Sequence, residues 1–151
     1  ATVKSSFYKI TINKRNPNIK VFEQSCPKFV DEIEKISIDY KKINYLADLY
    51  LRPLIKKNIS EIILGCSHYP LIYNVLRNKI HSNIRIIDPS VALVNKFNNS
   101  FLIPKKDSYN NIFQDNIKFF VTSKREEFSK KVKYWLEINK EIRLVNLRSN
   151  D

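Results

Sequence analysis

The 151-residue sequence predicts an α/β fold built on a parallel sheet. Short apolar runs at 61–65 and 84–87 contain β-branched residues and are typical of strands buried on both faces. Segments with apolar residues at helical spacing follow these runs, and such alternation favours parallel strands joined by helices. A hydrophobic fraction of 43% is that of a globular chain that can bury a core.

The other elements follow from periodicity and from residues that start or stop them. Apolar stripes predict helices within 3–10, 29–33, 43–50, 71–76, 91–97 and 128–135. Further strands are expected at 19–24, 117–121 and 142–145, and polar residues 102–116 are expected to form a loop. Thr2 is expected to cap the first helix, and Pro53 is expected to kink or end the third.

Charge and cysteine content narrow the functional classes. The net charge is +12, but the lysines are scattered, and Lys, Asn and Ile are abundant together, as in proteins from low-GC genomes. We therefore expect no nucleic-acid partner. No apolar run approaches the length of a membrane span, so no membrane partner is expected. Two cysteines make no disulfide framework, which favours a reducing cytoplasm.

One turn concentrates the chemistry of the chain. Gly65, the only glycine, ends the strand at 61–65 and should mark a sharp turn or a close approach of another group. Cys66, Ser67 and His68 follow, and Pro70 then begins a helix. Ligands of parallel sheets bind at the carboxyl ends of strands, and helix N-termini bind carboxylates. The alternative interpretation is a small buried cysteine beside a hydrogen-bonded histidine.

The sequence from Leu64 to Leu71, Leu-Gly-Cys-Ser-His-Tyr-Pro-Leu, resembles the second cysteine motif of glutamate racemases, Leu-Gly-Cys-Thr-His-Tyr-Pro-Leu. Four other segments resemble that family in the same order: residues 1–8, 26–34, 87–90 and 119–128. The resemblance implies a three-layer parallel-sheet lobe of the aspartate/glutamate racemase type in residues 1–101. Residues 102–151 would be a loop, strand and helix tail that returns to a first lobe, which is expected to be missing from this chain.

The resemblance also implies an isomerase that interconverts L- and D-glutamate, and D-glutamate would supply peptidoglycan in a bacterial cytoplasm. Cys66 would be one of two catalytic thiols, and the missing lobe would carry the other. His68 would assist Cys66, and Ser67 with His68 would bind the substrate. Glu34 would orient His68 or hold the substrate ammonium. No cofactor and no metal are expected, and the oligomeric state, including a homodimer, is left open.

Several positions depart from the family pattern. Ser67 replaces the usual Thr but keeps the hydroxyl. Asp31 and Glu32 stand where the family usually has Pro and an apolar residue, and Lys35 stands where another acid or Gly is common. Cys26 lies far from Cys66 in sequence and is expected to be structural.

Other functions remain open from the sequence. The parent enzyme could be an aspartate or hydantoin racemase of the same superfamily. The chain could also be a catalytically dead remnant that binds without turnover. In either case the 151-residue chain alone is predicted to be inactive, because inversion needs a second thiol on the opposite face of the substrate.

Overall fold

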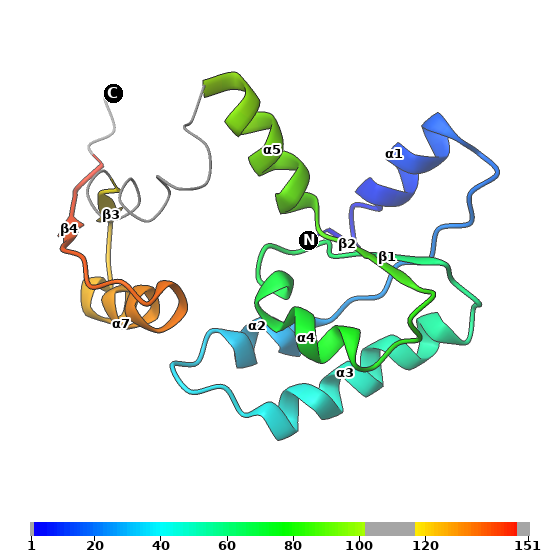
Figure 1. The fold of residues 1–151 in the computed structure, drawn as a ribbon, viewed down its shortest axis with the longest axis horizontal. Coiled ribbons are helices and arrows are strands. Elements are labelled where there is room, and N and C mark those ends of the chain that lie inside the picture. Colours follow the sequence, from blue (N-terminus) through cyan, green and yellow to red (C-terminus); the bar gives the residue numbers. More distant parts are fainter. Residues whose placement is uncertain (1, 102–116, 148–151) are drawn as a thin grey trace. The chain divides into compact units, whose positions relative to one another are not determined.

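The computed structural model describes residues 2–101 and 117–147. The chain divides into two compact units, Ala1–Lys96 and Phe97–Asp151. The first contains α1 (Phe7–Arg15), α2 (Pro27–Ile33), α3 (Tyr40–Ile55), β1 (Glu61–Ile63), the 3₁₀ turn η1 (Tyr69–Ile72), α4 (Tyr73–Arg77) and β2 (Arg85–Ile87). Helix α5 (Pro89–Phe101) begins in this unit and crosses its boundary (Figure 1).

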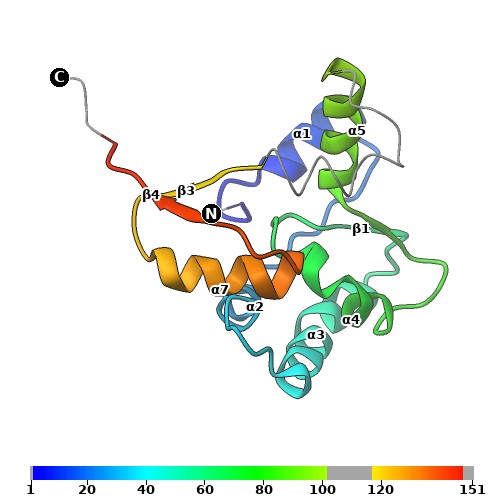
Figure 2. The same cartoon turned by 60° about the vertical axis from the view of Figure 1, so that its left-hand side comes forward.

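Strands β1 and β2 form a parallel pair in which Ile62 lies opposite Ile86. The pairing extends beyond β1, because the Leu64 N–H donates to the carbonyl of Ile87 at 2.9 Å. Helix α1 lies on one side of this pair and α3 with α4 on the other, as Figures 1 and 2 both show. The predicted α/β class with parallel strands is therefore confirmed.

Helix α3 supplies much of the core of the first unit. Asp39 caps it, since its side chain accepts from the backbone N–H groups of Lys41 and Lys42. Its apolar stripe is buried as the sequence predicts, with Ile43, Leu46, Ala47, Tyr50 and Leu51 facing inward. Pro53 lies inside the helix, which ends two residues later at Ile55. The proline therefore lies within the last turn, and the helix continues for two residues past it.

The predicted strand at 19–24 is wrong. Residues 20–26 have no regular secondary structure, and Ile19 and Phe22 are largely exposed. A strand exists only where its backbone groups pair with a neighbour, and among the described residues β1 pairs with β2 and β3 pairs with β4. The apolar pattern of 19–24 is therefore real, but no described strand lies beside it.

Two predicted helix starts also shift. Helix α1 begins at Phe7, and Thr2 lies in the preceding turn, so Thr2 does not cap it. The residue before α1 is Ser6, which has a φ of 49° and makes no capping hydrogen bond through its side chain. Pro70 opens the 3₁₀ turn η1, and the α-helix proper begins only at Tyr73. In both places a turn precedes the helix that periodicity predicts.

The second unit, in its described part, contains β3 (Phe119–Val121), α7 (Arg125–Leu136) and β4 (Ile142–Leu144). The two strands are parallel and α7 connects them, which makes a β-α-β arrangement. Phe119 contacts Phe128 with ring centroids 6.1 Å apart, and Val132 and Ile142 are buried. The predicted loop at 102–116 lies outside the described residues.

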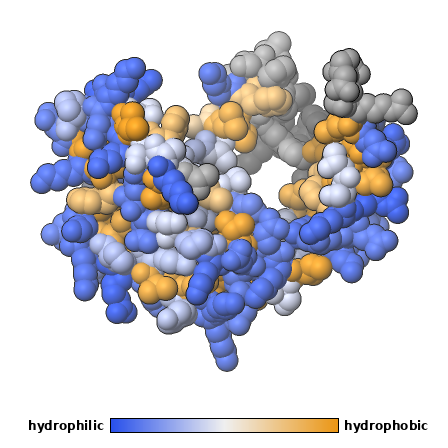
Figure 3. All heavy atoms as spheres, turned by 180° about the vertical axis from the view of Figure 1, so that it is seen from behind, coloured by the Kyte–Doolittle hydropathy of each residue, from blue (hydrophilic) through white to orange (hydrophobic). Residues whose placement is uncertain are grey.

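The surface is mostly hydrophilic on the face in Figure 3, where apolar residues appear as separate patches. This agrees with the scattered lysines of a chain with a net charge of +12. Among the described residues, no helix is both long and apolar enough to cross a bilayer.

One carboxylate is an exception to the apolar interior. The Glu32 side chain in α2 is only 1% exposed, and its Oε2 atom lies 2.7 Å from Lys35 Nζ and 2.9 Å from Lys42 Nζ. The hydrogen bonds from these two ammonium groups hold the pKa of Glu32 at about 2, well below its usual value. The charged Glu32 therefore joins α2 to the first turn of α3.

We expect the free energy of unfolding of Glu32→Gln to depend less on pH below about 4.5 than that of the wild type. A carboxylate with a lowered folded-state pKa stabilises the fold fully above its unfolded value of about 4.5, and that contribution is lost as the pH falls toward about 2. The free energy of unfolding of the wild type should therefore fall more steeply than that of Glu32→Gln in this window. Urea unfolding at stepped pH measures the difference, and parallel curves would contradict it.

Candidate active site

The candidate site is the turn that follows β1. Leu64 is buried at the end of the strand, and the chain then turns through residues 65–68 into η1. Backbone hydrogen bonds fix this turn, because Tyr69 N–H donates to the Cys66 carbonyl and Leu71 N–H to the His68 carbonyl, each at 3.1 Å. The turn therefore presents its side chains from a fixed backbone at the carboxyl end of a parallel strand.

Three predicted residues form a chain of contacts. Cys66 Sγ lies 3.6 Å from His68 Nδ1, and His68 Nε2 lies 2.8 Å from Glu34 Oε1. With neutral His68, the carboxylate selects the tautomer that carries its proton on Nε2, so Nδ1 presents a lone pair to the thiol. We call Cys66, His68 and Glu34 the relay. Such an arrangement can move a proton between the thiol and the imidazole.

The relay is accessible from solvent. Cys66 is half-buried, the His68 side chain is 32% exposed and the Glu34 side chain is 45% exposed. Ser67 is exposed between Cys66 and His68. The hydroxyl that the sequence assigns to substrate binding therefore lies on the open side of the turn.

Glu34 reaches His68 because α2 packs against η1. The ring of Phe29, which is 2% exposed, meets the rings of Tyr50 and Tyr69 edge-on at 5.1 and 5.5 Å between centroids. The Tyr69 hydroxyl also donates to the Cys26 carbonyl at 3.4 Å. Phe29 and Tyr69 thus hold α2 and the turn together, and Glu34 follows directly at the end of α2.

Cys26 lies closer to this site than its sequence separation suggests. It precedes α2, and burial raises the pKa of its thiol to about 11, partly offset by a hydrogen bond with Tyr69, while the charge of Cys66 adds to the rise. Burial likewise raises the pKa of Tyr69, and Cys26 and Cys66 add to that rise. The 40-residue separation of Cys26 and Cys66 in the sequence gave no sign that the two thiols lie near one another. The Cys-Pro pair at the start of α2 is the local signal that could have drawn attention to Cys26.

Gly65 marks a close approach rather than a left-handed turn, since no described glycine has a positive φ. A Cβ atom at Gly65 would lie 3.4 Å from Tyr8 Cε2 and 3.9 Å from Thr2 Cγ2. The aromatic ring of Tyr8 therefore covers the backbone immediately before Cys66.

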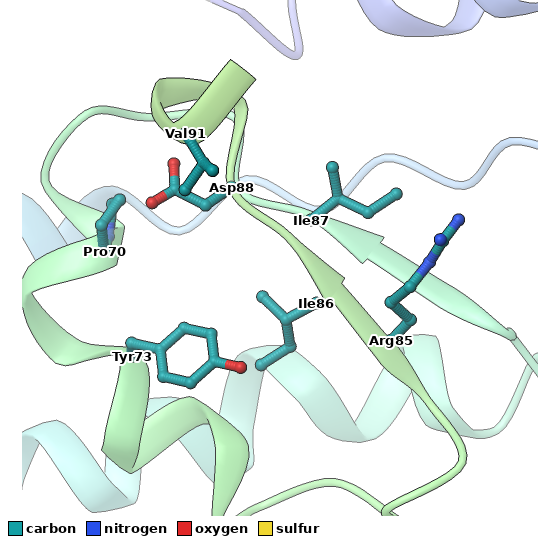
Figure 4. A pocket seen from close by; sticks show the side chains of 7 residues that line it. All are labelled: Pro70, Tyr73, Arg85, Ile86, Ile87, Asp88 and Val91. Atoms are coloured by element: carbon teal, nitrogen blue, oxygen red, sulfur yellow. The ribbon is translucent and has the colours of Figure 1, made fainter. Parts of the chain in front are cut away.

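An open hollow of about 630 Å³ has Pro70 in its lining (Figure 4). It is lined by Pro70, Tyr73, Arg85, Ile86, Ile87, Asp88 and Val91. Figure 4 shows the Ile86 and Tyr73 side chains facing one another across it. Cys66, His68 and Glu34 are not part of its lining, so the relay and this hollow are separate features.

Asp88 has a local structural partner. Its Oδ1 atom accepts from the Ser90 backbone N–H at 2.9 Å, which is a capping contact at the start of α5. In the described ranges, no three His, Cys, Asp or Glu side chains are grouped as a metal ion would require.

Comparison with known proteins identifies the relatives. A glutamate racemase from Prochlorococcus marinus is 42% identical over 151 residues, which are 98% of this chain and 56% of that protein. One from a Thermoanaerobacter species is 33% identical over 129 residues, which are 85% of this chain and 48% of that protein. The resemblance to glutamate racemases is confirmed. No family model matches the chain.

Solved structures agree with this result. A glutamate racemase isoform from Bacillus anthracis has the same fold, with a TM-score of 0.77 at 23% identity over 97% of this chain and 54% of its own. A glutamate racemase from Francisella tularensis gives a TM-score of 0.71 at 28% identity over 96% of this chain and 54% of its own. The chain spans about half the length of the glutamate racemases that it matches.

We expect Cys26 to react slowly with alkylating agents because burial keeps it protonated. With a pKa of about 11, Cys26 should be alkylated about a hundredfold more slowly at pH 8 than an ordinary cysteine, because only the thiolate reacts. Iodoacetamide labelling of Cys66→Ser isolates Cys26, and its rate should rise until about pH 11. A plateau below pH 9.5 would show that burial does not control this thiol.

Proposed function

We propose that this chain is part of a glutamate racemase and supplies one of its two acid–base thiols, Cys66. The observation that carries this proposal is the relay, in which Sγ lies 3.6 Å from His68 Nδ1 and Nε2 lies 2.8 Å from Glu34 Oε1. A thiol, a base and an orienting carboxylate in this order match the roles needed for proton abstraction.

The reaction begins with transfer of the Cys66 proton to His68 Nδ1, while Glu34 keeps the imidazole oriented through Nε2. The resulting thiolate removes the α-proton of L-glutamate and leaves a carbanion beside the substrate carboxylate. A second thiol then donates a proton from the opposite face, which gives D-glutamate. In the reverse direction Cys66 is the donor. After D-glutamate leaves, the second thiolate takes a proton from solvent and His68 gives one back to solvent, which restores the starting state; no cofactor takes part.

Substrate binding is assigned to the exposed part of the turn. Ser67 supplies a hydroxyl and His68 lies beside it, so both can contact a substrate carboxylate next to Cys66. The choice of glutamate is supported by the relatives, because the Francisella tularensis enzyme was solved with D-glutamate. D-Glutamate made in a bacterial cytoplasm would be used for peptidoglycan.

The second thiol belongs to a complementary lobe of the parent enzyme. Cys26 is a poor candidate for the second thiol, because its pKa of about 11 keeps it protonated at neutral pH. Cys26 also contacts Tyr69 of the same turn that carries Cys66. The complementary lobe is therefore the principal partner of this chain, and a second copy of the chain is not needed for the chemistry.

A chimera tests the proposal directly. This chain should replace the matching region of the Prochlorococcus marinus racemase, with which it shares 42% identity. Conversion of L-glutamate to D-glutamate is followed by chiral chromatography. We expect the chimera to be active and its Cys66→Ser variant to lose activity by about 10³-fold or more, as expected when the acid–base group is removed.

Controls separate the alternatives. Cys26→Ser should keep most of the activity, because that thiol takes no part in proton transfer. A well-folded chimera that racemises aspartate but not glutamate would assign a different substrate. A chimera that binds glutamate without any turnover would instead favour a catalytically dead remnant.

We expect the 151-residue chain alone to produce no D-glutamate. One base can exchange a proton on one face of the α-carbon, but inversion needs a donor on the other face. Purified chain is incubated with L-glutamate in D₂O, and both the α-proton signal and the enantiomers are measured. Appreciable D-glutamate would mean that the chain contains both bases and would overturn the assignment of the second thiol to another lobe.

A further inference from the structure

We infer that the ion pair between the buried Glu32 carboxylate and the half-exposed Lys42 ammonium positions Glu34 on His68. Neither Glu32 nor Lys42 belongs to the relay, so this makes them positioning residues rather than catalytic ones. Their importance for catalysis rests on the proposed function. The hydrogen bond between Glu34 and His68 can nevertheless be measured in this chain alone.

The ion pair anchors the end of α2 to the beginning of α3. Glu32 lies in the last turn of α2, and Oε2 accepts from Lys42 Nζ at 2.9 Å. Lys35 Nζ, on the segment after α2, lies 2.7 Å from the same oxygen. Glu34 lies between Glu32 and Lys35 in the chain, and the side chains of those two residues bind one another.

The position of Lys42 is unusual for a cation. The first turn of a helix carries a partial positive charge, which disfavours lysine there. Lys42 nevertheless lies in the first turn of α3, where Asp39 caps the helix through the N–H groups of Lys41 and Lys42. The bond to Glu32, and the nearby charge of Asp39, raise the pKa of Lys42 and keep it protonated. The Glu32 carboxylate thus offsets the unfavourable placement of Lys42.

Stability alone does not account for a carboxylate at position 32. The Glu32 carboxylate is buried while both of its lysine partners are half exposed, so its desolvation is offset only in part, and an apolar replacement for a buried charge is often neutral or stabilising. In addition, Glu32 Oε1 is buried and accepts no hydrogen bond from any described residue, which adds to the cost.

The ion pair restricts the orientation of the last turn of α2, and Glu34 follows directly after that turn. Ile33 is 1% exposed and anchors the same turn of α2 in the core. Apolar contacts are non-directional and allow small rotations of a helix, whereas a hydrogen-bonded ion pair fixes distance and angle. Glu34 is 45% exposed and must meet His68 Nε2 at 2.8 Å, so a small rotation of α2 would break this contact.

Histidine side-chain NMR tests the inference. The chain has two histidines, His68 and His81, and a His81→Gln variant assigns their signals. In Glu32→Leu and in Lys42→Met, the Nε2–H proton of His68 should exchange with water about tenfold faster, the size expected for loss of one hydrogen bond to a charged group. The midpoint of urea unfolding of Glu32→Leu should stay equal to that of the wild type or rise.

Asp48→Asn is the matched control. It removes another ion pair of α3, in which Asp48 Oδ2 lies 2.7 Å from Lys79 Nζ, and it should leave the His68 signal unchanged. Glu34→Ala removes the acceptor and gives the reference signal for a lost contact. If Glu34→Ala leaves His68 unchanged, the relay and the proposed function fail, which is a different outcome from failure of the positioning pair.

Unchanged His68 exchange in Glu32→Leu and Lys42→Met, together with faster exchange in Glu34→Ala, overturns the inference. If Glu32→Leu does not fold, Lys42→Met decides, because Glu32 then keeps Lys35 as a partner. If neither variant folds, the ion pair is a requirement for folding, and the positioning role is rejected.

Discussion

The candidate site depends on the packing of α2 against the turn that follows β1. Glu34 and His68 are 34 residues apart in the chain, yet their side chains lie 2.8 Å apart. No local rule of helix or turn geometry makes this contact. It follows from the buried ring of Phe29, which meets the Tyr69 ring edge-on and thereby fixes α2 beside η1. Core packing therefore brings α2 to the turn, and the orientation of Glu34 within that packing is the separate matter that the Glu32 ion pair addresses.

The sequence predicted those features that depend on residues close together in the chain. The stripe of α3, the parallel strands β1 and β2, and the turn with Cys66 all depend on periodicity or on adjacent residues. The strand at 19–24 failed because a strand also needs a partner, which no local pattern can supply. Likewise, the motif at 65–70 predicted Cys66 and His68, but the proximity of Cys26 to them depends on how Tyr69 packs. Tertiary contacts explain most of what periodicity missed.

Glu32, Lys35 and Lys42 form one electrostatic unit. Lys35 Nζ and Lys42 Nζ lie 2.7 and 2.9 Å from the same oxygen of Glu32. A buried carboxylate alone would be strongly destabilising. The two ammonium groups leave the carboxylate charged, as its pKa of about 2 reflects. Residues from α2, from the segment after it and from α3 are thus joined at one oxygen atom.

Glu34 can act on His68 in two ways: it can orient the ring through Nε2, and its charge can stabilise the imidazolium. An amide at this position could still accept from His68 Nε2–H, so Glu34→Gln can preserve the orientation of the ring. It cannot preserve the negative charge, which stabilises the imidazolium that forms when Nδ1 takes the thiol proton. An orienting role predicts little loss in the amide variant, whereas an electrostatic role predicts a large loss with unchanged geometry. Since the Glu34 side chain is 45% exposed, solvent screens its charge in the free chain. The electrostatic role therefore becomes strong only where a bound substrate and a second lobe exclude water from the relay.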